Sequence, residues 1–276
     1  MKARLIILFL TFFISFQMVQ AQNIGLQLYS LRAQFKTDVP GTLAKIKSWG
    51  ITEIEGGGTY NLPIDEYKKL LAQNNLKMVS VSVEFDELST NPQKAIDEAK
   101  SFGAKYIVCF WIPHSGDNFT IDDMKKAVDV FNTAGKVISE NGLSLCYHPH
   151  GYEFRPYNQG TLFDYMVQHT DAKYFNFEMD VFWVKQTGQD PVALLQKYPK
   201  RFVMLHLKDR KPGTADSQNG QADEESNVVL GQGDVNIAAI MKEAKKIGIK
   251  HYFIEDESSR SVEQIPESLA YLHQLK

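Results

Sequence analysis

The sequence predicts an α/β protein that folds as a single-domain (β/α)8 TIM barrel. Eight short apolar segments alternate with eight segments of helical periodicity, and no linker or internal repeat divides them. Short apolar strands separated by helices are typical of all-parallel sheets, because each parallel crossover needs a helix between consecutive strands. Eight such units close most simply into a barrel, and residues 22–276 have the usual length of one, roughly 250 residues.

Residues 1–21 are predicted to be a secretory signal peptide. Lys2 and Arg4 precede an almost unbroken apolar run over residues 5–16, and small residues before Gln22 suit cleavage there. A retained membrane anchor is the competing interpretation, but the run is shorter than the ~20 residues that span a bilayer. We therefore expect an exported protein, periplasmic or secreted, with no membrane association after cleavage and a barrel over residues 22–276.

The predicted strands are short runs of aliphatic and aromatic residues bounded by glycine or polar residues. A doubly wound open sheet would need a glycine-rich phosphate turn after the first strand, which instead ends in Tyr29-Ser30-Leu31-Arg32. The closed barrel is therefore favoured. The strands are predicted over residues 24–29, 51–55, 77–85, 106–111, 143–148, 174–180, 201–207 and 251–255.

Each strand is followed by a segment with helix signals. Asp65 and Glu66 favour the first turn of the second helix, where acidic residues are stabilising. Gly103 and Gly248 follow the third and seventh helices, and glycine readily adopts the left-handed conformation that terminates a helix. The helices are predicted over residues 39–49, 64–73, 91–102, 121–141, 161–169, 191–197, 237–246 and 262–275.

One connection is much longer than the others. Residues 209–234, after the seventh strand, are polar and glycine-rich. A long loop in a compact domain usually serves function, and loops after barrel strands lie on the active face. We expect a lid that is mobile without substrate and ordered over it.

The charge balance argues against a nucleic-acid partner, and the positions of the two cysteines bear on whether the chain has a disulfide. The chain carries 30 Lys and Arg against 33 Asp and Glu. Without a basic excess, nucleic acid is not an expected partner. Cys109 and Cys146 both lie inside apolar strands. Two buried free thiols are the favoured interpretation, and a bridge between them stays open.

Four consecutive strands end in side chains that bind metals. The fifth ends at His148, with His150 and Glu153 just beyond, and the next three end at Asp180, His206 and Glu255. Because catalytic groups of barrels come from the carboxyl ends of strands, these side chains are expected at one mouth. A mixed oxygen and nitrogen site suits one divalent ion, namely Mn, Co, Mg, Fe or Zn.

Six motifs now point to a family. In order they are GLQLYSLR from residue 25, HPHGYEF from 148, DVFW from 180, HLKD from 206, GQGD from 231 and EDE from 255. Together they resemble the xylose-isomerase-like TIM-barrel superfamily, which includes sugar phosphate isomerases/epimerases and inosose dehydratase. The resemblance covers nearly all of residues 22–276.

The resemblance implies one divalent metal held by Glu, Asp, His and Glu on strands five to eight. Asp180, His206 and Glu255 match this pattern. Glu153 is taken as the fourth ligand, with His148 as the alternative, because many epimerases have a glutamate where this chain has His148. That departure argues against a simple ketose 3-epimerase, whose mechanism uses two metal-bound glutamates as acid and base.

Further residues are assigned to catalysis and substrate binding. His150 is either a proton carrier or a donor that holds Glu153, and Lys208 either stabilises an enolate or pairs with Glu178 or Glu257. Tyr29 and Trp183 either stack on a sugar or pack in the core. The predicted catalytic residues are Glu153, Glu255, His150 and Lys208. The predicted substrate-binding residues are Gln27, Tyr29, Glu55, His148, Trp183, Lys208 and Glu257.

The first functional hypothesis is a metal-dependent sugar isomerase or epimerase that removes a proton next to a carbonyl. A lyase or hydratase acting on a keto-sugar, 3-keto-glycoside or inosose is the runner-up. A noncatalytic sugar-binding module is the third, and it would tolerate chelation of metal. The expected partner is a small carbohydrate or cyclitol, and a homo-oligomer is compatible with the sequence.

Overall fold

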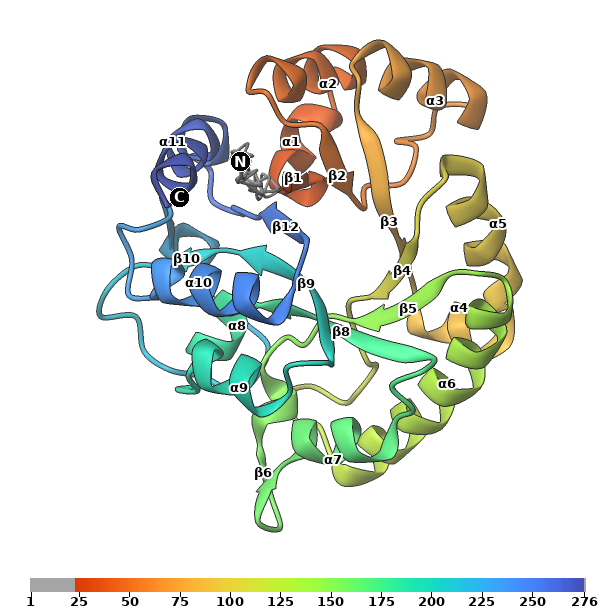
Figure 1. The fold of residues 1–276 in the computed structure, drawn as a ribbon, viewed down its shortest axis with the longest axis vertical. Coiled ribbons are helices and arrows are strands. Elements are labelled where there is room, and N and C mark those ends of the chain that lie inside the picture. The colour runs from red at the N-terminus through yellow and green to blue at the C-terminus, as the bar shows by residue number, and fades with distance from the viewer. Residues whose placement is uncertain (1–22, 276) are drawn as a thin grey trace, which may run out of the picture.

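The barrel predicted from the sequence is confirmed. The computed structural model describes residues 23–275, so the proposed signal peptide lies outside the described residues. Eight parallel strands close into a ring with helices outside it (Figure 1). In order round the ring they are β1 (Asn23–Gln27), β2 (Glu53–Glu55), β3 (Lys77–Val83), β4 (Tyr106–Cys109), β5 (Ser144–Tyr147), β8 (Phe175–Asp180), β9 (Phe202–Leu207) and β12 (His251–Ile254).

The outer layer consists of the helices that the sequence predicted, with bounds that differ by a few residues at most. Thr120 and Asp123 form a capping box at the start of α6, and Gly103 and Gly248 end α5 and α10 in the left-handed conformation. These helices are α2 (Val39–Ser48), α3 (Ile64–Gln73), α5 (Pro92–Phe102), α6 (Ile121–Glu140), α7 (Leu162–His169), α9 (Pro191–Lys197), α10 (Ile237–Ile247) and α11 (Ser261–Gln274).

Several short elements follow the strands and were not predicted. Most connect a strand to its outer helix and shape the carboxyl end of the barrel. They are η1 (Leu28–Leu31), α1 (Arg32–Phe35), α4 (Phe85–Thr90), η2 (Tyr152–Phe154), β6 (Pro156–Tyr157), β7 (Gly160–Thr161), α8 (Val181–Gln186), β10 (Asp209–Arg210), η3 (Glu224–Ser226) and β11 (Asn227–Val228).

Two apolar clusters fill the molecule. The larger one packs the strands against the helices. The smaller one joins side chains from five of the eight strands of the ring and plugs the inside of the barrel. Its members are Val79, Val108, Cys146, Met204 and Phe253. Cys146 in this plug and Cys109 are both buried free thiols, as expected.

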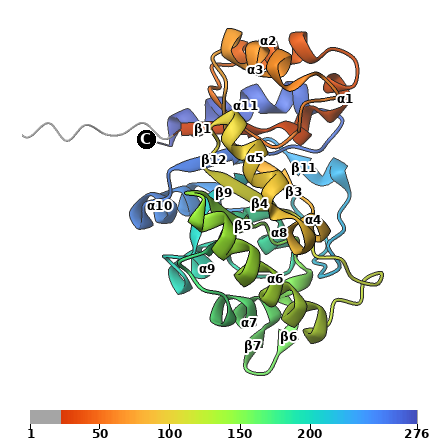
Figure 2. The ribbon, with the colours of Figure 1, turned by 90° about the vertical axis from the view of Figure 1, so that its right-hand side faces the viewer.

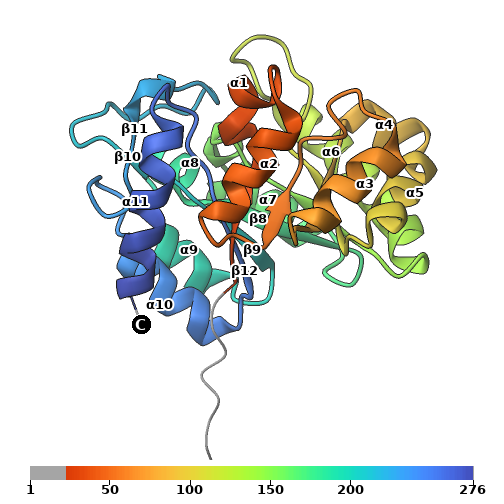
Figure 3. The same cartoon turned by 90° about the horizontal axis from the view of Figure 1, so that it is seen from above.

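The long segment 209–234 is tied at its base. β10 pairs antiparallel with β11, and the Asp209 carboxylate accepts the backbone N–H groups of Gly231, Gly233 and Val235. Arg210 donates twice to Asp234, at 3.0 and 2.8 Å. Figures 2 and 3 place β11 and α1 at the same end of the barrel. Beyond this base the segment is also bonded to the barrel, because Gln186 donates to the Ala215 carbonyl and Arg155 donates to the Gln218 carbonyl.

No helix among residues 23–275 is long and apolar enough to cross a membrane.

Gly135 of α6 gives a test of how tightly the helices are seated on the barrel. A Cβ at this position would lie 2.7 Å from the backbone carbonyl oxygen of Tyr174. Alanine improves helix propensity by about 1 kcal/mol, but overpacking against a rigid backbone costs about 1–3 kcal/mol. We expect Gly135→Ala to lower the free energy of unfolding in a urea titration. Thr133→Ala, at an exposed position of the same helix, should leave it unchanged or raised; equal effects would contradict the packing argument.

Candidate metal centre

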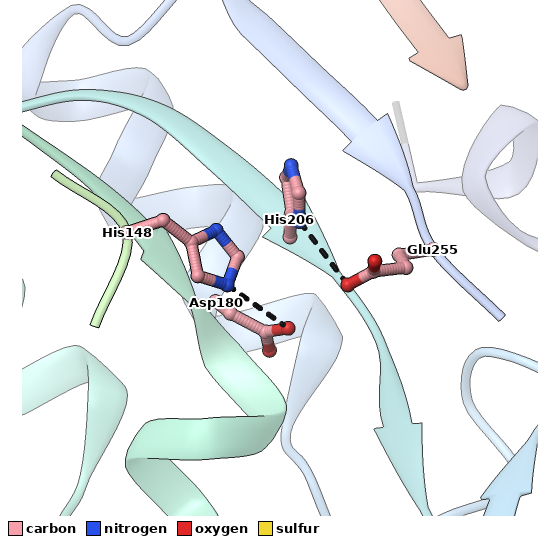
Figure 4. A group of neighbouring side chains, drawn as sticks. All are labelled: His148, Asp180, His206 and Glu255. Atoms are coloured by element: carbon pink, nitrogen blue, oxygen red, sulfur yellow. Dashed lines mark hydrogen bonds and ion pairs between the residues drawn. The ribbon is translucent and has the colours of Figure 1, made fainter. Parts of the chain in front are cut away.

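Four ligand-type side chains meet at the carboxyl ends of adjacent strands. His148 follows β5, Asp180 ends β8, His206 lies in β9, and Glu255 follows β12 (Figure 4). One ligand atom from each lies within 4.8 Å of the others. His148 Nε2 is 3.8 Å from Asp180 Oδ2, and His206 Nδ1 is 3.2 Å from Glu255 Oε2. Because β8 pairs with β9 so that Asp180 lies opposite His206, the strand register itself builds this group.

The chemistry of this group fits a divalent cation. Asp180 Oδ1 accepts the backbone N–H groups of Phe182 and Trp183, which caps α8 and fixes the carboxylate. Asp180 Oδ2 is buried and has no hydrogen-bond partner in the described part of the chain. An orphaned buried carboxylate oxygen is costly unless a cation satisfies it. With two imidazoles and two carboxylates, the set suits Zn, Co, Mn or Fe better than an all-oxygen ion such as Mg.

Glu153, the expected strand-five ligand, lies outside the group, and His148 takes that place. The turn after β5 folds the Glu153 carboxylate backward, where it accepts the Tyr147 hydroxyl and the backbone N–H groups of His150 and Gly151. Gly151 has a φ of 105°, a conformation that favours glycine and allows this turn. Glu153 therefore holds the shape of the turn that carries His148 and His150.

Two more carboxylates lie directly beneath the metal group. Glu55 accepts hydrogen bonds from Gln27 Nε2, at 3.0 Å, and from the Ser80 hydroxyl, and it also contacts His206 Nε2. Glu178 Oε2 lies 3.2 Å from the same His206 nitrogen. Glu55 was expected to bind substrate, but it is fully buried and does not line the cavity. Glu178 was missed as a site residue, although its period-two spacing from Asp180 places both on one face of β8.

Burial and neighbouring charges raise the pKa of some side chains in and beneath the metal group and lower the pKa of others. Burial raises the pKa of Asp180 to about 7, partly opposed by Lys208. Burial and the charge of Glu55 raise the pKa of Glu178 to about 8. Burial lowers the pKa of His148, and the neighbouring His206 lowers it further. The pKa of His206 is raised instead, because three carboxylates outweigh its burial. The metal-free site thus holds protons that a cation would displace.

A cavity of about 380 Å³ lies against the metal group, and Glu255 is the member of the group that lines it. Of the predicted substrate-binding residues, Gln27, Tyr29 and Glu257 line it, together with Glu255 and His150. Trp183 instead packs behind His150, with ring centroids 5.4 Å apart. Arg32, at the end of the GLQLYSLR motif, also lines the cavity. The lining residues that the sequence did not point to lie outside the six motifs; they are Gly57, Tyr60, Ser82 and Phe110.

His150 is the best-placed proton acceptor in the cavity. Its Nδ1 lies 3.3 Å from the carbonyl oxygen of His148, so the Nδ1–H tautomer donates there and Nε2 keeps a free lone pair. Burial lowers the pKa of His150 to about 4, so the ring is neutral at pH 7. Together these features make the imidazole a base in the resting site.

The cations at this mouth are already paired with carboxylates. Lys208 Nζ lies 3.0 Å from Glu257 and 3.5 Å from Glu255. Although burial lowers the pKa of Lys208, these two carboxylates raise it overall. Arg32 pairs with Glu224 and also donates to the Glu257 carbonyl. Among residues 23–275, the mouth therefore has no cluster of unpaired cations of the kind that holds a phosphate group.

We expect His148→Gln to lose bound metal and Glu153→Gln to keep it. The first change removes a ring nitrogen from the ligand group, and an affinity loss on the order of 100-fold or more is expected. The second weakens only the turn, so it should lower the free energy of unfolding by about 1–3 kcal/mol. Metal content by mass spectrometry and urea unfolding separate the two effects. Metal loss in Glu153→Gln alone would return the ligand assignment to Glu153.

Metal affinity should fall as the pH drops below about 7. Burial raises the pKa of Asp180 to about 7, and the cation needs the ionised carboxylate. Below that pH each bound cation must displace a proton, so affinity should fall about tenfold per pH unit. Titration of the metal-free protein with Co²⁺ between about pH 5.5 and about pH 8 measures this slope. A flat profile would show that Asp180 is already ionised or is not a ligand.

Comparison with known proteins gives matches along most of the chain. A family model described as the xylose isomerase-like TIM barrel matches residues 43–275. Proteins named inosose dehydratase are 25% identical over 181 residues in Clostridium beijerinckii and 26% identical over 190 residues in Bacillus anthracis. These alignments cover 58% and 60% of this chain, and they span only 59% and 62% of the relatives' own length.

Solved structures match over a larger share of the chain. A sugar phosphate isomerase/epimerase from Parabacteroides distasonis ATCC 8503 is 27% identical with a TM-score of 0.76, covering 93% of this chain and 95% of that one. The zinc-bound IolI protein is 16% identical with a TM-score of 0.70, covering 92% of this chain and 97% of that one. The second match shows likeness of fold alone.

Proposed function

Because the chain belongs to the xylose isomerase-like TIM-barrel family, we propose that it is a metal-dependent lyase acting on a neutral sugar or cyclitol ketone. It removes the proton next to the carbonyl and expels an oxygen substituent from the neighbouring carbon. The observation that carries this proposal is that Glu255, a member of the group His148, Asp180, His206 and Glu255, lines the same cavity as the neutral imidazole of His150. Zinc in the IolI structure supports a divalent metal of that kind.

The residues of the cavity divide the work. The four-residue group would hold a divalent ion, which would supply Lewis acidity toward a carbonyl oxygen and so acidify the adjacent C–H bond. His150 Nε2 takes the proton, because its lone pair is free and the ring is neutral. Lys208 is fully buried and does not line the cavity, so its ammonium acts on the developing oxyanion through the field of its charge and not by contact. Glu257 lines the cavity and burial raises its pKa, so we assign it as the acid that gives a proton to the departing oxygen, with Glu255 left as the partner of Lys208.

Elimination fits this arrangement better than epimerisation. Epimerisation needs proton carriers on both faces of the substrate carbon, and the strand-five position that would supply a second metal-bound carboxylate holds His148. Elimination needs one base and one acid, which His150 and Glu257 provide. The relatives named inosose dehydratase support the same reaction class. Isomerisation is the second candidate, because the matched Parabacteroides structure is described as a sugar phosphate isomerase/epimerase.

The paired cations of the mouth support a substrate without a phosphate group. Lys208 and Arg32 are neutralised by carboxylates of the chain itself, and a phosphate would add negative charge beside Glu255 and Glu257. An exported location, outside the cytoplasm, agrees with this, since we propose residues 1–21 as a signal peptide. Inososes and 3-keto-glycosides are therefore the substrate classes to test first.

We expect turnover on such ketones that chelation abolishes and Co²⁺ or Zn²⁺ restores. Reactions in D2O, followed by NMR, separate the outcomes, because elimination forms a new unsaturated or enolised product and isomerisation incorporates deuterium into a saturated one. Matched phosphorylated sugars should react more slowly. If chelation changes neither binding nor turnover, the chain is a sugar-binding module and the enzymatic proposal fails.

We also expect His150→Gln to lower kcat by about 10²–10⁴-fold while metal content stays unchanged, because the variant lacks the proton acceptor. His169→Gln, an exposed histidine at the end of α7, is the matched control and should keep full activity. Full activity in His150→Gln would remove this residue from the chemistry.

A further inference from the structure

Glu178 is a buried carboxylate that touches both histidines of the metal group. Its Oε2 lies 3.3 Å from His148 Nδ1 and 3.2 Å from His206 Nε2, and the side chain is fully buried. It does not line the cavity, so substrate does not reach it. The proposed chemistry leaves this carboxylate without a role.

The two histidines use their nitrogens in a consistent way. His148 points Nε2 toward Asp180, and His206 points Nδ1 toward Glu255. The second nitrogen of each ring points down to Glu178, and that of His206 also meets Glu55. Each ring therefore has one nitrogen facing the ligand group and one facing a buried carboxylate. A histidine ligand keeps its metal-binding lone pair when the other nitrogen donates its proton to such a partner.

We propose that Glu178 is a positioning residue that fixes the tautomer and ring orientation of His148 and His206 and thereby sets the affinity of the metal site. The inference rests on the proposed metal centre. It also explains why a histidine is compatible with the strand-five position. An imidazole N–H there is stabilised by Glu178. A carboxylate at the same place would lie at hydrogen-bond distance from the Glu178 carboxylate and would be repelled by its like charge.

The two inner carboxylates, Glu55 and Glu178, do not form a second cation site with His206. Glu55, Glu178 and His206 are close enough to share an ion. Both Glu55 oxygens are already used, however, one by Gln27 and His206 and the other by Ser80. His206 cannot offer both ring nitrogens to cations without losing its last proton. Glu55 is therefore a support for His206, and Glu178 is the support shared by both rings.

The test is metal affinity of the metal-free protein, measured with Co²⁺ or Zn²⁺ against a chromophoric chelator. We expect Glu178→Gln to weaken binding by about 10–100-fold and to change the visible Co²⁺ absorption, since the ring orientations relax. The control is Glu53→Gln, which breaks a buried carboxylate–histidine pair with His251, at 2.7 Å, at the amino ends of β2 and β12. Its affinity and spectrum should match those of the wild type.

A second pair of variants tests whether Glu178 affects metal affinity through His148. The conclusion then does not depend only on the folding stability of Glu178→Gln. His148→Glu should bind Co²⁺ more weakly than the wild type, and adding Glu178→Gln to it should recover part of the loss. Wild-type affinity in Glu178→Gln, equal losses in Glu178→Gln and Glu53→Gln, or no recovery in the double variant would each overturn the inference. Absence of metal binding by the wild type would instead overturn the proposed function itself.

Discussion

Buried negative charge is the constraint on which the rest of this structure depends. Glu55, Glu178, Asp180 and Glu255 all lie close to His206 at the carboxyl end of the barrel, and the first three are fully buried. Ionised carboxylates without partners are strongly unfavourable in such surroundings. His206 and Lys208 offset part of this charge, and the raised pKa values of Asp180 and Glu178 show that protons carry another part. A divalent cation would replace those protons.

The barrel meets this constraint with layers of different chemistry. The plug that includes Cys146, Met204 and Phe253 seals the inside of the ring and excludes water from below. Glu178 lies opposite Met204 of this plug in the register of β8 and β9, two residues before Asp180 of the metal group, and the cavity is lined by His150 and Glu255. Period-two alternation along β5, β8 and β9 produces this order, because residues two apart on a strand point the same way at successive depths. The apolar plug thus supports the metal group from inside the barrel, and the cavity lies on the side of the group that faces the carboxyl ends of the strands.

The loops at the carboxyl end of the barrel set the orientation of His150 and the charge around the cavity. Glu153 folds the turn after β5 so that His150 faces the substrate, and the Asp209 and Arg210 bonds hold the base of segment 209–234. Glu224 from that segment reaches Arg32 at the mouth. A residue of segment 209–234 therefore pairs with a cation of the cavity wall.

The sequence by itself determined the fold and three of the four metal-group residues. Eight alternating strand and helix patterns admit few arrangements other than a barrel, and Asp180, His206 and Glu255 end or follow apolar strands whose ends must converge. The sequence could not place Glu153, because a turn with one left-handed glycine sends its carboxylate back to Tyr147 and to backbone N–H groups. It could not assign Glu178 either, because spacing gives the face of a strand but not the depth of a side chain within the ring. The tertiary structure brings His148, and not Glu153, close to Asp180, His206 and Glu255, because local hydrogen bonds turn the Glu153 carboxylate away from them.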